Sequence, residues 1–296
     1  MGLVEYDSDS EDAPVLKSQH VSAEDPAVKR KRTLPTLPPS FATGVGPNDD
    51  PSLHQGRKRT RPYVDGDYDT HVYISLPVPS IFRATLDDIV KKTAHRSPGV
   101  DLHSFLQSSA HLHISLAHPF PLRQSQIPEF KADLLRALRS LRGARTKGVF
   151  PLSLGGRLRV YYNGKKYGGE GHGGRAFLAL RVSAGMKEID EIVNKAIHPL
   201  LQKLHRPLYH SDPEYHASFA WCLTDPLGRG DAGEGDVELC GPEPAGTPVN
   251  VPISDETVIE VSDHFQRLIL DAQPKGGWFV NKIVLKIGKD KTELAL

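Results

Sequence analysis

The sequence is poor in cysteine, in net charge and in long apolar runs. It holds two cysteines, Cys222 and Cys240, too few for a disulfide framework or a cysteine-ligated zinc site and typical of a reducing compartment. Its 37 Lys and Arg residues nearly balance 36 Asp and Glu residues. No apolar run approaches the roughly 18 residues that a membrane-spanning helix needs, and the first residues lack the layout of a secretory signal. We therefore expect a soluble globular protein without a membrane segment.

The first 66 residues differ in composition from the rest of the chain. They contain an acidic serine cluster at Ser8–Asp12, a proline-rich segment at Leu34–Pro39 and basic runs at Lys29–Arg32 and Gly56–Arg61. The apolar surface of this segment is too small to offset the conformational entropy that the chain would lose on folding. We therefore expect residues 1–66 to form a disordered tail. The two basic runs favour a nuclear address, with an RNA-contacting arm and a plain solvated tail as alternatives.

The remaining chain, residues 67–296, contains two copies of a short pattern. His113–Leu116 (the first motif) reads His, apolar, Ser, apolar, and His216–Phe219 (the second motif) repeats it. Side chains alternate across a strand, so the His and Ser of each motif share a face while the apolar residues point into a core. Two such strands brought together offer two imidazoles and two hydroxyls, which can move protons and stabilise charge on a phosphate.

Apolar periodicity predicts strands and helices throughout residues 67–296. We expect helices at 81–92, 127–141, 186–205 (kinked or ended early by Pro199) and 253–270, the last capped by Ser254. We expect strands at 71–76, 112–116, 150–154, 157–162, 176–182, 215–223 and 279–287, followed by 292–296. Residues 225–252 are rich in Gly, Pro, Asp and Glu, which indicates a mobile acidic insertion. This order predicts an α+β fold of two pseudo-symmetric lobes, each with antiparallel sheet and helices, around a central cleft.

Three other features have competing interpretations. The glycine-rich segment 168–174 is interpreted as a flexible hairpin tip, with a phosphate-cradling loop as the alternative. His71 stands in a strand whose His-to-Ser spacing differs from the motifs, and we interpret it as an ordinary strand residue. His111 shares the face of His113, so these two residues, with His216 as a third ligand, are candidate metal ligands. We expect no metal, and we interpret His111 either as a residue that supports the site from behind its reactive groups or as a residue at the end of the strand.

The segment around the second motif resembles a known family. Residues 209–222 read YHSDPEYHASFAWC, which closely resembles the tyrosine, Asp-Pro-x-aromatic-His-x-Ser-x-Ala-Trp-Cys segment of the U6 snRNA phosphodiesterases, within the 2H phosphodiesterase superfamily. VEYDSDS at 4–10, THVY at 70–73 and the first motif agree with that family. The resemblance extends over residues 59–290.

This resemblance implies the 2H phosphodiesterase fold and a 3′→5′ RNA exonuclease that trims the uridine-rich 3′ tail of U6 snRNA in the nucleus. It implies transesterification by the 2′-hydroxyl without metal or other cofactor, which leaves a 2′,3′-cyclic phosphate that some members open to a 3′-phosphate. The alternatives are a 2′,3′-cyclic nucleotide phosphodiesterase, an RNA ligase-like 2H enzyme and a non-catalytic RNA-binding scaffold. The expected partner is the RNA 3′ end, and we expect a monomer.

Roles for the motif residues follow from the chemistry. Two histidines suit acid–base catalysis near neutral pH because an imidazole titrates at about 6.5. We favour His216 as base and His113 as acid, with Ser115 and Ser218 donating hydrogen bonds to the phosphate. The assignment of the two histidines stays open at this point, as do the chemical form of the product 3′ end and the tail preference.

One aromatic residue is assigned to the substrate base. Tyr209 precedes the second motif, and the resemblance implies that it stacks on the terminal base, with its neighbour His210 as the alternative. Stacking of a base on an aromatic ring is worth about 1–3 kcal/mol and tolerates any base.

Overall fold

The computed structural model describes residues 64–144, 148–163, 174–209, 213–224 and 252–296. Apart from a few residues at their edges, the expected tail, the glycine-rich segment 168–174 and the insertion 225–252 lie outside the described residues, as does His210. None of the described helices is both long and apolar enough to cross a bilayer.

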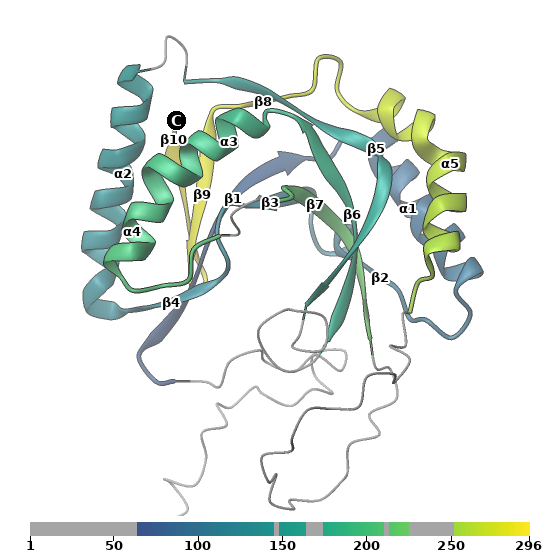
Figure 1. The fold of residues 1–296 in the computed structure, drawn as a ribbon, viewed down its shortest axis with the longest axis horizontal. Helices are drawn as coiled ribbons and strands as arrows, with labels where there is room; N and C mark the ends of the chain where they lie inside the picture. Colours follow the sequence, from purple (N-terminus) through teal and green to yellow (C-terminus); the bar gives the residue numbers. More distant parts are fainter. Residues whose placement is uncertain (1–63, 145–147, 164–173, 210–212, 225–251) are drawn as a thin grey trace, which may run out of the picture. The chain divides into compact units, whose positions relative to one another are not determined.

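The described elements are strands and helices mixed along the chain (Figure 1). In chain order they are β1 (Asp67–Pro77), α1 (Ser80–Arg96), β2 (His103–Ser104), η3 (Phe105–Gln107), β3 (His111–Ser115), β4 (Phe120–Arg123), η4 (Gln124–Gln126), α2 (Ile127–Ala144), β5 (Phe150–Asn163), β6 (Arg175–Ala184), α3 (Met186–Ile192), η6 (Val193–Ile197), α4 (His198–Lys203), β7 (His216–Leu223), α5 (Asp255–Ala272), β8 (Trp278–Val280), β9 (Lys282–Ile287) and β10 (Asp290–Ala295).

The strands form an antiparallel arrangement in the order β10-β9-β1-β3-β7-β6-β5-β8. We call β10, β9, β1 and β3, with β4 beside β1, the first lobe, and β7, β6, β5 and β8, with β2 beside β7, the second lobe. The predicted α+β class with two lobes of antiparallel sheet is thereby confirmed, while the central cleft stays a prediction. The lobes do not divide the sequence into halves, because β9 and β10 return to the first lobe after β8.

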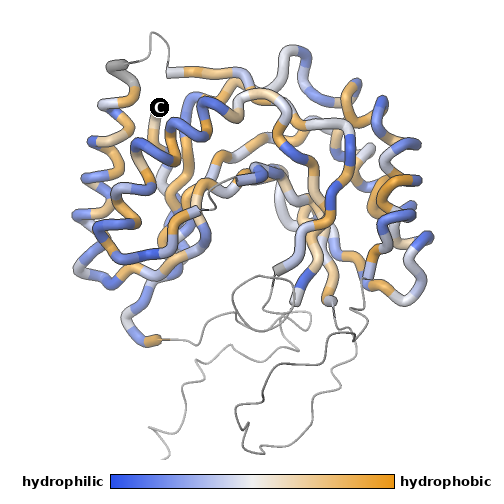
Figure 2. Tube along the Cα trace, in the orientation of Figure 1, coloured by the Kyte–Doolittle hydropathy of each residue, from blue (hydrophilic) through white to orange (hydrophobic). Residues whose placement is uncertain are grey.

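Alternation along each strand separates a core face from a second face. In β1, Val72, Ile74 and Leu76 are buried, whereas His71 and Tyr73 are partly exposed. The buried set belongs to the same apolar cluster as the buried stripes of α1, α2, α3 and α5. Figure 2 shows the mixed hydropathy along these strands and helices. The helices therefore cover the core face, and the polar residues of the strands lie on the opposite face.

The strands expected at 150–154 and 157–162 are one strand, β5, with an irregular stretch between Ser153 and Leu158 where its pairing with β6 shifts register. There α5 approaches closely, because a Cβ at Gly156 would lie 2.8 Å from the carbonyl oxygen of Gln266. The Leu158 amide donates a hydrogen bond to Ser262 Oγ at 3.0 Å. A helix side chain thus satisfies a backbone amide at the end of the irregular stretch, which a strand-by-strand prediction does not foresee.

The helix expected at 186–205 runs from Met186 to Lys203 and is interrupted by one wide turn, Val193–Ile197. A proline ring clashes with the carbonyl group four residues earlier in a regular helix. For Pro199 that residue is Lys195, within the wide turn, so the local widening accommodates the ring. The predicted cap of α5 is confirmed, since Ser254 Oγ accepts a hydrogen bond from the Thr257 amide.

The strand expected at 279–287 is wrong as a single element. Residues 278–280 form β8 and pair with β5 in the second lobe, whereas 282–287 form β9 and pair with β1 in the first lobe. Asn281 separates them. A single alternation through 279–287 would place Phe279 and Ile283 on the same face, but Phe279 is exposed and Ile283 is buried, so the buried face changes at the break.

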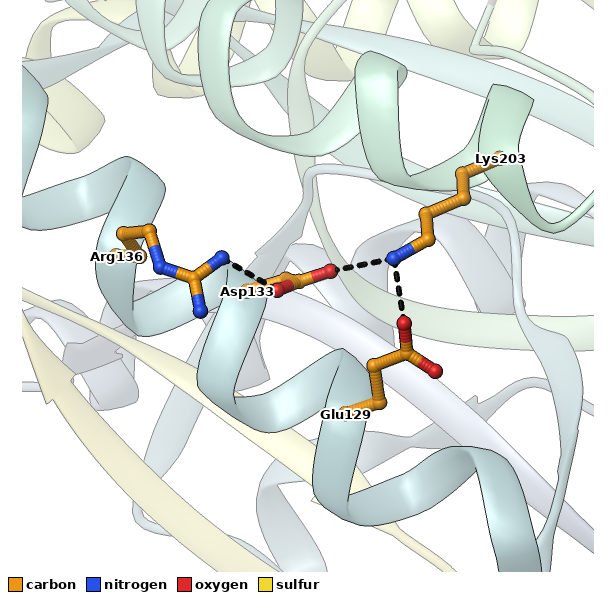
Figure 3. Close-up of polar contacts among 4 residues, drawn as sticks. All are labelled: Glu129, Asp133, Arg136 and Lys203. Carbon is orange, nitrogen blue, oxygen red and sulfur yellow. Dashed lines mark hydrogen bonds and ion pairs between the residues drawn. The ribbon is translucent and has the colours of Figure 1, made fainter.

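Ion pairs connect helix α4 to helix α2 (Figure 3). Lys203 Nζ lies 2.6 Å from Glu129 Oε1 and 2.9 Å from Asp133 Oδ2, and Asp133 Oδ1 accepts a hydrogen bond from Arg136 at 2.7 Å. The hydrogen bond from Lys203, then that from Arg136, lowers the pKa of the Asp133 carboxyl below its usual value. The charged form of Asp133 therefore stabilises the fold.

We expect Asp133→Asn to lower the melting temperature at neutral pH, with a deficit that shrinks in acid. A carboxyl whose pKa is lowered by folding contributes stability above its unfolded pKa and loses that contribution as pH falls through the folded pKa. Thermal unfolding between pH 7 and pH 2 measures this. Asp88→Asn, which breaks an exposed pair with Lys91 inside one helix, is the control and should change stability less. Equal melting temperatures and pH dependence for both variants would contradict the prediction.

Candidate active site

The two motifs meet where the two lobes join. Strands β3 and β7 pair antiparallel, and Ile114 stands opposite Ala217. Both of these residues are fully buried. Because an antiparallel ladder places the neighbours of such a pair opposite one another, the His of each motif stands opposite the Ser of the other. The sequence predicts two motif strands brought face to face around a cleft. In the structure they are instead neighbours in one antiparallel ladder, and its register brings the motifs into direct contact.

All four motif side chains lie on the face opposite the core. His113 and Ser115 in β3, and His216 and Ser218 in β7, are partly exposed, while the residues between them are buried. Strand geometry alone explains this, since residues two apart share a face. Two imidazoles and two hydroxyls are therefore gathered around one ladder position.

His216 is held by the second lobe. Its Nδ1 lies 2.7 Å from the carbonyl oxygen of Glu214. A carbonyl oxygen only accepts hydrogen bonds, so Nδ1 carries the proton and Nε2 of the neutral ring has a free lone pair. The Tyr161 ring stacks on the imidazole at 3.8 Å and 11°. The Glu214 carboxylate in turn accepts a hydrogen bond from Tyr161 Oη at 3.0 Å and pairs with Arg181 at 3.1 Å. Ring plane and tautomer of His216 are thus fixed together.

His113 lies in an aromatic cluster of the first lobe. Its ring meets the Tyr73 ring edge-on at 5.6 Å and the His71 ring at 5.5 Å and 88°. Burial raises the pKa of the Tyr73 hydroxyl, so this phenol stays neutral. The ring contacts of His113 are therefore aromatic, whereas His216 is held by a network that includes the charged groups of Glu214 and Arg181.

Sequence reasoning misses His71 as part of this site. Its Nε2 lies 3.0 Å from Ser115 Oγ, and its ring packs on Tyr73 at 5.0 Å. A signal for it is present in the sequence, because His71, Tyr73 and Ser75 alternate with apolar residues as the motif residues do. The spacing of four between His71 and Ser75 is even, so both also share the site face.

Burial lowers the pKa of each histidine of the site. For His113 the main cause is burial, followed by His216 and Lys286. For His216 burial outweighs the opposing effects of the backbone hydrogen bond and carboxylate of Glu214. Burial, His113 and Lys286 lower the pKa of His71 to about 3, so His71 is neutral at physiological pH. The free protein thus holds these histidines mainly neutral near pH 7.

Lys286 supplies positive charge at the edge of the site. It stands directly opposite His71 in the pairing of β1 with β9, and it is exposed. Directly opposed residues of an antiparallel pair project from the same face of the sheet. The ammonium group therefore lies on the site face, where a phosphate would meet it, and no sequence motif marks it.

Tyr209 packs at the boundary of the core. Its ring lies 5.0 Å from that of His118 and stacks on Tyr215 at 5.8 Å and 15°. Burial raises its pKa to about 12. Its assignment to the substrate base stays a prediction, and the alternative, His210, lies outside the described residues.

In the described part of the chain, no group of three or more His, Cys, Asp and Glu side chains could hold a metal ion. His111 is exposed at the start of β3.

Half-buried imidazoles and hydroxyls around one point have the composition needed for proton transfer and for hydrogen bonding to an anion.

Comparison with known proteins identifies relatives of the chain. Three proteins named U6 snRNA phosphodiesterase 1 match it. The Neurospora crassa protein is 31% identical over 254 residues, 72% of this chain and 66% of the relative. The Xenopus laevis protein is 29% identical over 76% of this chain and 81% of the relative. The human protein is 26% identical over 62% of this chain and 61% of the relative. These names agree with the family that the sequence resembles.

A solved structure and a family model also match. The structure of Kluyveromyces marxianus Usb1 superposes with a TM-score of 0.47 at 15% identity, over 77% of this chain and 98% of that one. The HVSL family model, described as an uncharacterised conserved protein, matches residues 35–238. That match spans more than half of the sequence and includes both motifs, and the chain therefore belongs to the HVSL family.

Proposed function

We propose that this protein is a metal-independent RNA phosphodiesterase that removes nucleotides from the 3′ end of U6 snRNA. The observation that carries the proposal is the meeting of two His-x-Ser strands through the Ile114–Ala217 pair. The names of the relatives support the choice of substrate. We further propose that the protein acts as a monomer in the nucleus, on a uridine-rich tail.

The reaction uses the nucleophile that RNA carries. The 2′-hydroxyl of the penultimate ribose attacks the phosphorus that joins it to the terminal nucleotide. The 2′-oxygen–phosphorus bond forms, the bond to the 5′-oxygen breaks, and the RNA ends in a 2′,3′-cyclic phosphate. Dependence on the 2′-hydroxyl restricts the enzyme to RNA. Opening of the cyclic phosphate by water would give a 3′-phosphate.

His216 acts as the base in this scheme. Its Nδ1–H is engaged by the Glu214 carbonyl, so the free lone pair on Nε2 can accept the 2′ proton. Once protonated, the imidazolium is stabilised by the Glu214 carboxylate nearby, a group that already acts to raise the pKa of His216. Tyr161 holds the ring in plane by stacking.

His113 acts as the acid and donates its proton to the departing 5′-oxygen. Its pKa is lowered in the free protein, and the negative charge of a bound phosphate favours its protonated form. Ser115 and Ser218 donate hydrogen bonds to the non-bridging oxygens, where charge increases in the transition state. Tyr209 stacks on the terminal base. When a cyclic phosphate is opened, the two histidines exchange roles.

We expect His113→Ala and His216→Ala each to slow cleavage of a 5′-labelled oligo(U) RNA by about 10²–10⁴-fold, because each removes one proton-transfer group. Wild type should shorten this RNA from the 3′ end in EDTA. A single 2′-deoxy group on the penultimate nucleotide should block the first cleavage. His95→Ala, an exposed histidine at the end of α1, is the control and should cleave normally.

The same assay separates the competing functions. Full activity in both motif variants would contradict the proposal. RNA that is bound but never cleaved by wild type would favour a non-catalytic scaffold, and turnover of 2′,3′-cyclic nucleotides alone would favour a cyclic phosphodiesterase. Mass analysis of the shortened RNA identifies the chemical form of its 3′ end.

We expect a bell-shaped pH profile of kcat/KM with its maximum below about 6.5, the ordinary pKa of histidine. The maximum lies midway between the pKa values of His113 and His216 in the free enzyme, whichever is the acid, and both values are lowered. Lys286→Met removes a charge that lowers the pKa of His113, so it should move the maximum to higher pH. Lys289→Met, at the exposed turn after β9, should leave it in place. A maximum above pH 7 in wild type would refute this scheme.

A further inference from the structure

A third imidazole contacts the proposed phosphate-binding hydroxyl of the first lobe. His71 Nε2 lies 3.0 Å from Ser115 Oγ. The contact runs diagonally between strands, since Tyr73 and not His71 stands directly opposite Ser115 in the pairing of β1 with β3. Packing on Tyr73 and the edge-on contact with His113 hold the His71 ring in place.

His71 is a poor candidate for proton transfer to the substrate. Its neighbours His113 and Lys286 disfavour a positive charge on the ring, and burial does so more strongly. The nitrogen that faces the site is already engaged by Ser115. A neutral imidazole with Nε2–H can still donate a hydrogen bond to Oγ. The hydroxyl proton of Ser115 is then free to point at another acceptor.

Among the described residues, no histidine contacts Ser218 as His71 contacts Ser115. On β6, Ala179 stands opposite Ser218 in the register. The second lobe instead uses its polar network, Tyr161 with Glu214, to hold His216. The two lobes therefore stabilise different members of their motifs, the hydroxyl in the first and the imidazole in the second.

We propose that His71 is a positioning residue, whose Nε2–H holds Ser115 Oγ so that the serine proton points at a non-bridging phosphate oxygen. The inference rests on the proposed RNA phosphodiesterase function and deepens it. His71 touches neither the attacking nor the departing oxygen and acts through Ser115 alone. Its removal leaves the serine hydroxyl free to rotate away from the phosphate.

A set of substitutions at position 71 tests this on oligo(U) RNA. We expect His71→Ala to lower kcat about tenfold, the effect of losing one hydrogen bond. The amide nitrogen of Gln reaches about as far as Nε2, so His71→Gln should recover most of the rate. The shorter Asn should not. His95→Gln serves as the control for a His-to-Gln change elsewhere and should match wild type.

A double-mutant cycle distinguishes positioning from a merely structural role. If His71 acts through Ser115, then Ser115→Ala and Ser115→Ala with His71→Ala should cleave at the same rate. With a phosphorothioate linkage, the rate ratio of the two diastereomers should move in the same direction in His71→Ala as in Ser115→Ala. A structural role would slow both diastereomers equally. Melting temperatures of all variants identify any that misfold, and the folded His71→Gln protein then carries the test.

The outcomes distinguish failure of the proposed function from failure of the positioning role of His71 alone. If wild type leaves the RNA intact, the proposed function fails and this inference fails with it. If wild type cleaves, but His71→Gln is as slow as His71→Ala and the effects of His71→Ala and Ser115→Ala multiply, only the positioning role is overturned.

Discussion

The candidate site depends on one short stretch of pairing between two half-sheets. Ile114 opposite Ala217 is the register position that joins β3 to β7, and both side chains are sealed in the core. A slip of one residue in either strand would turn the motif of that strand over and bury its histidine. Burial of the apolar pair therefore fixes the register, and the register places each histidine opposite a serine. Packing on one face of the sheet thus determines the chemistry available on the other.

The histidines of the two motifs have different electrostatic surroundings, although the motifs themselves are similar. His216 has a carbonyl and a carboxylate of Glu214 close by, so its protonated form is partly compensated. His113 is surrounded by aromatic rings and by Lys286, so its protonated form is disfavoured until an anion arrives. We therefore expect the site to favour a negatively charged ligand, because a phosphate would offset the positive charge of Lys286 and of a protonated His113. The pseudo-symmetry of the fold does not extend to the electrostatics.

Local patterns predict the motif strands, the cap at Ser254 and most helices, because these depend on residues close in sequence. They do not predict which strands become neighbours. The change of partner at Asn281 carries β9 back to the first lobe and places Lys286 opposite His71. Likewise the contact of His71 with Ser115 arises from the pairing of β1 with β3, a relation between residues far apart in the chain. Register and strand order are tertiary properties, and the site elements that depend on them stay hidden in the sequence.

His71 also shows how a motif can mislead. If His-x-Ser is taken as the functional unit, His71 is excluded, because it lies four residues before Ser75. In a strand, however, any even spacing places two side chains on the same face. In β1, β3 and β7 alike, polar residues at even spacing share one face, and three strands therefore contribute to the same surface. The geometry therefore favours the face of the sheet, and not the tetrapeptide, as the unit that forms the candidate site. A tetrapeptide marks where that face carries reactive groups, and the neighbouring strands decide how those groups are oriented and charged.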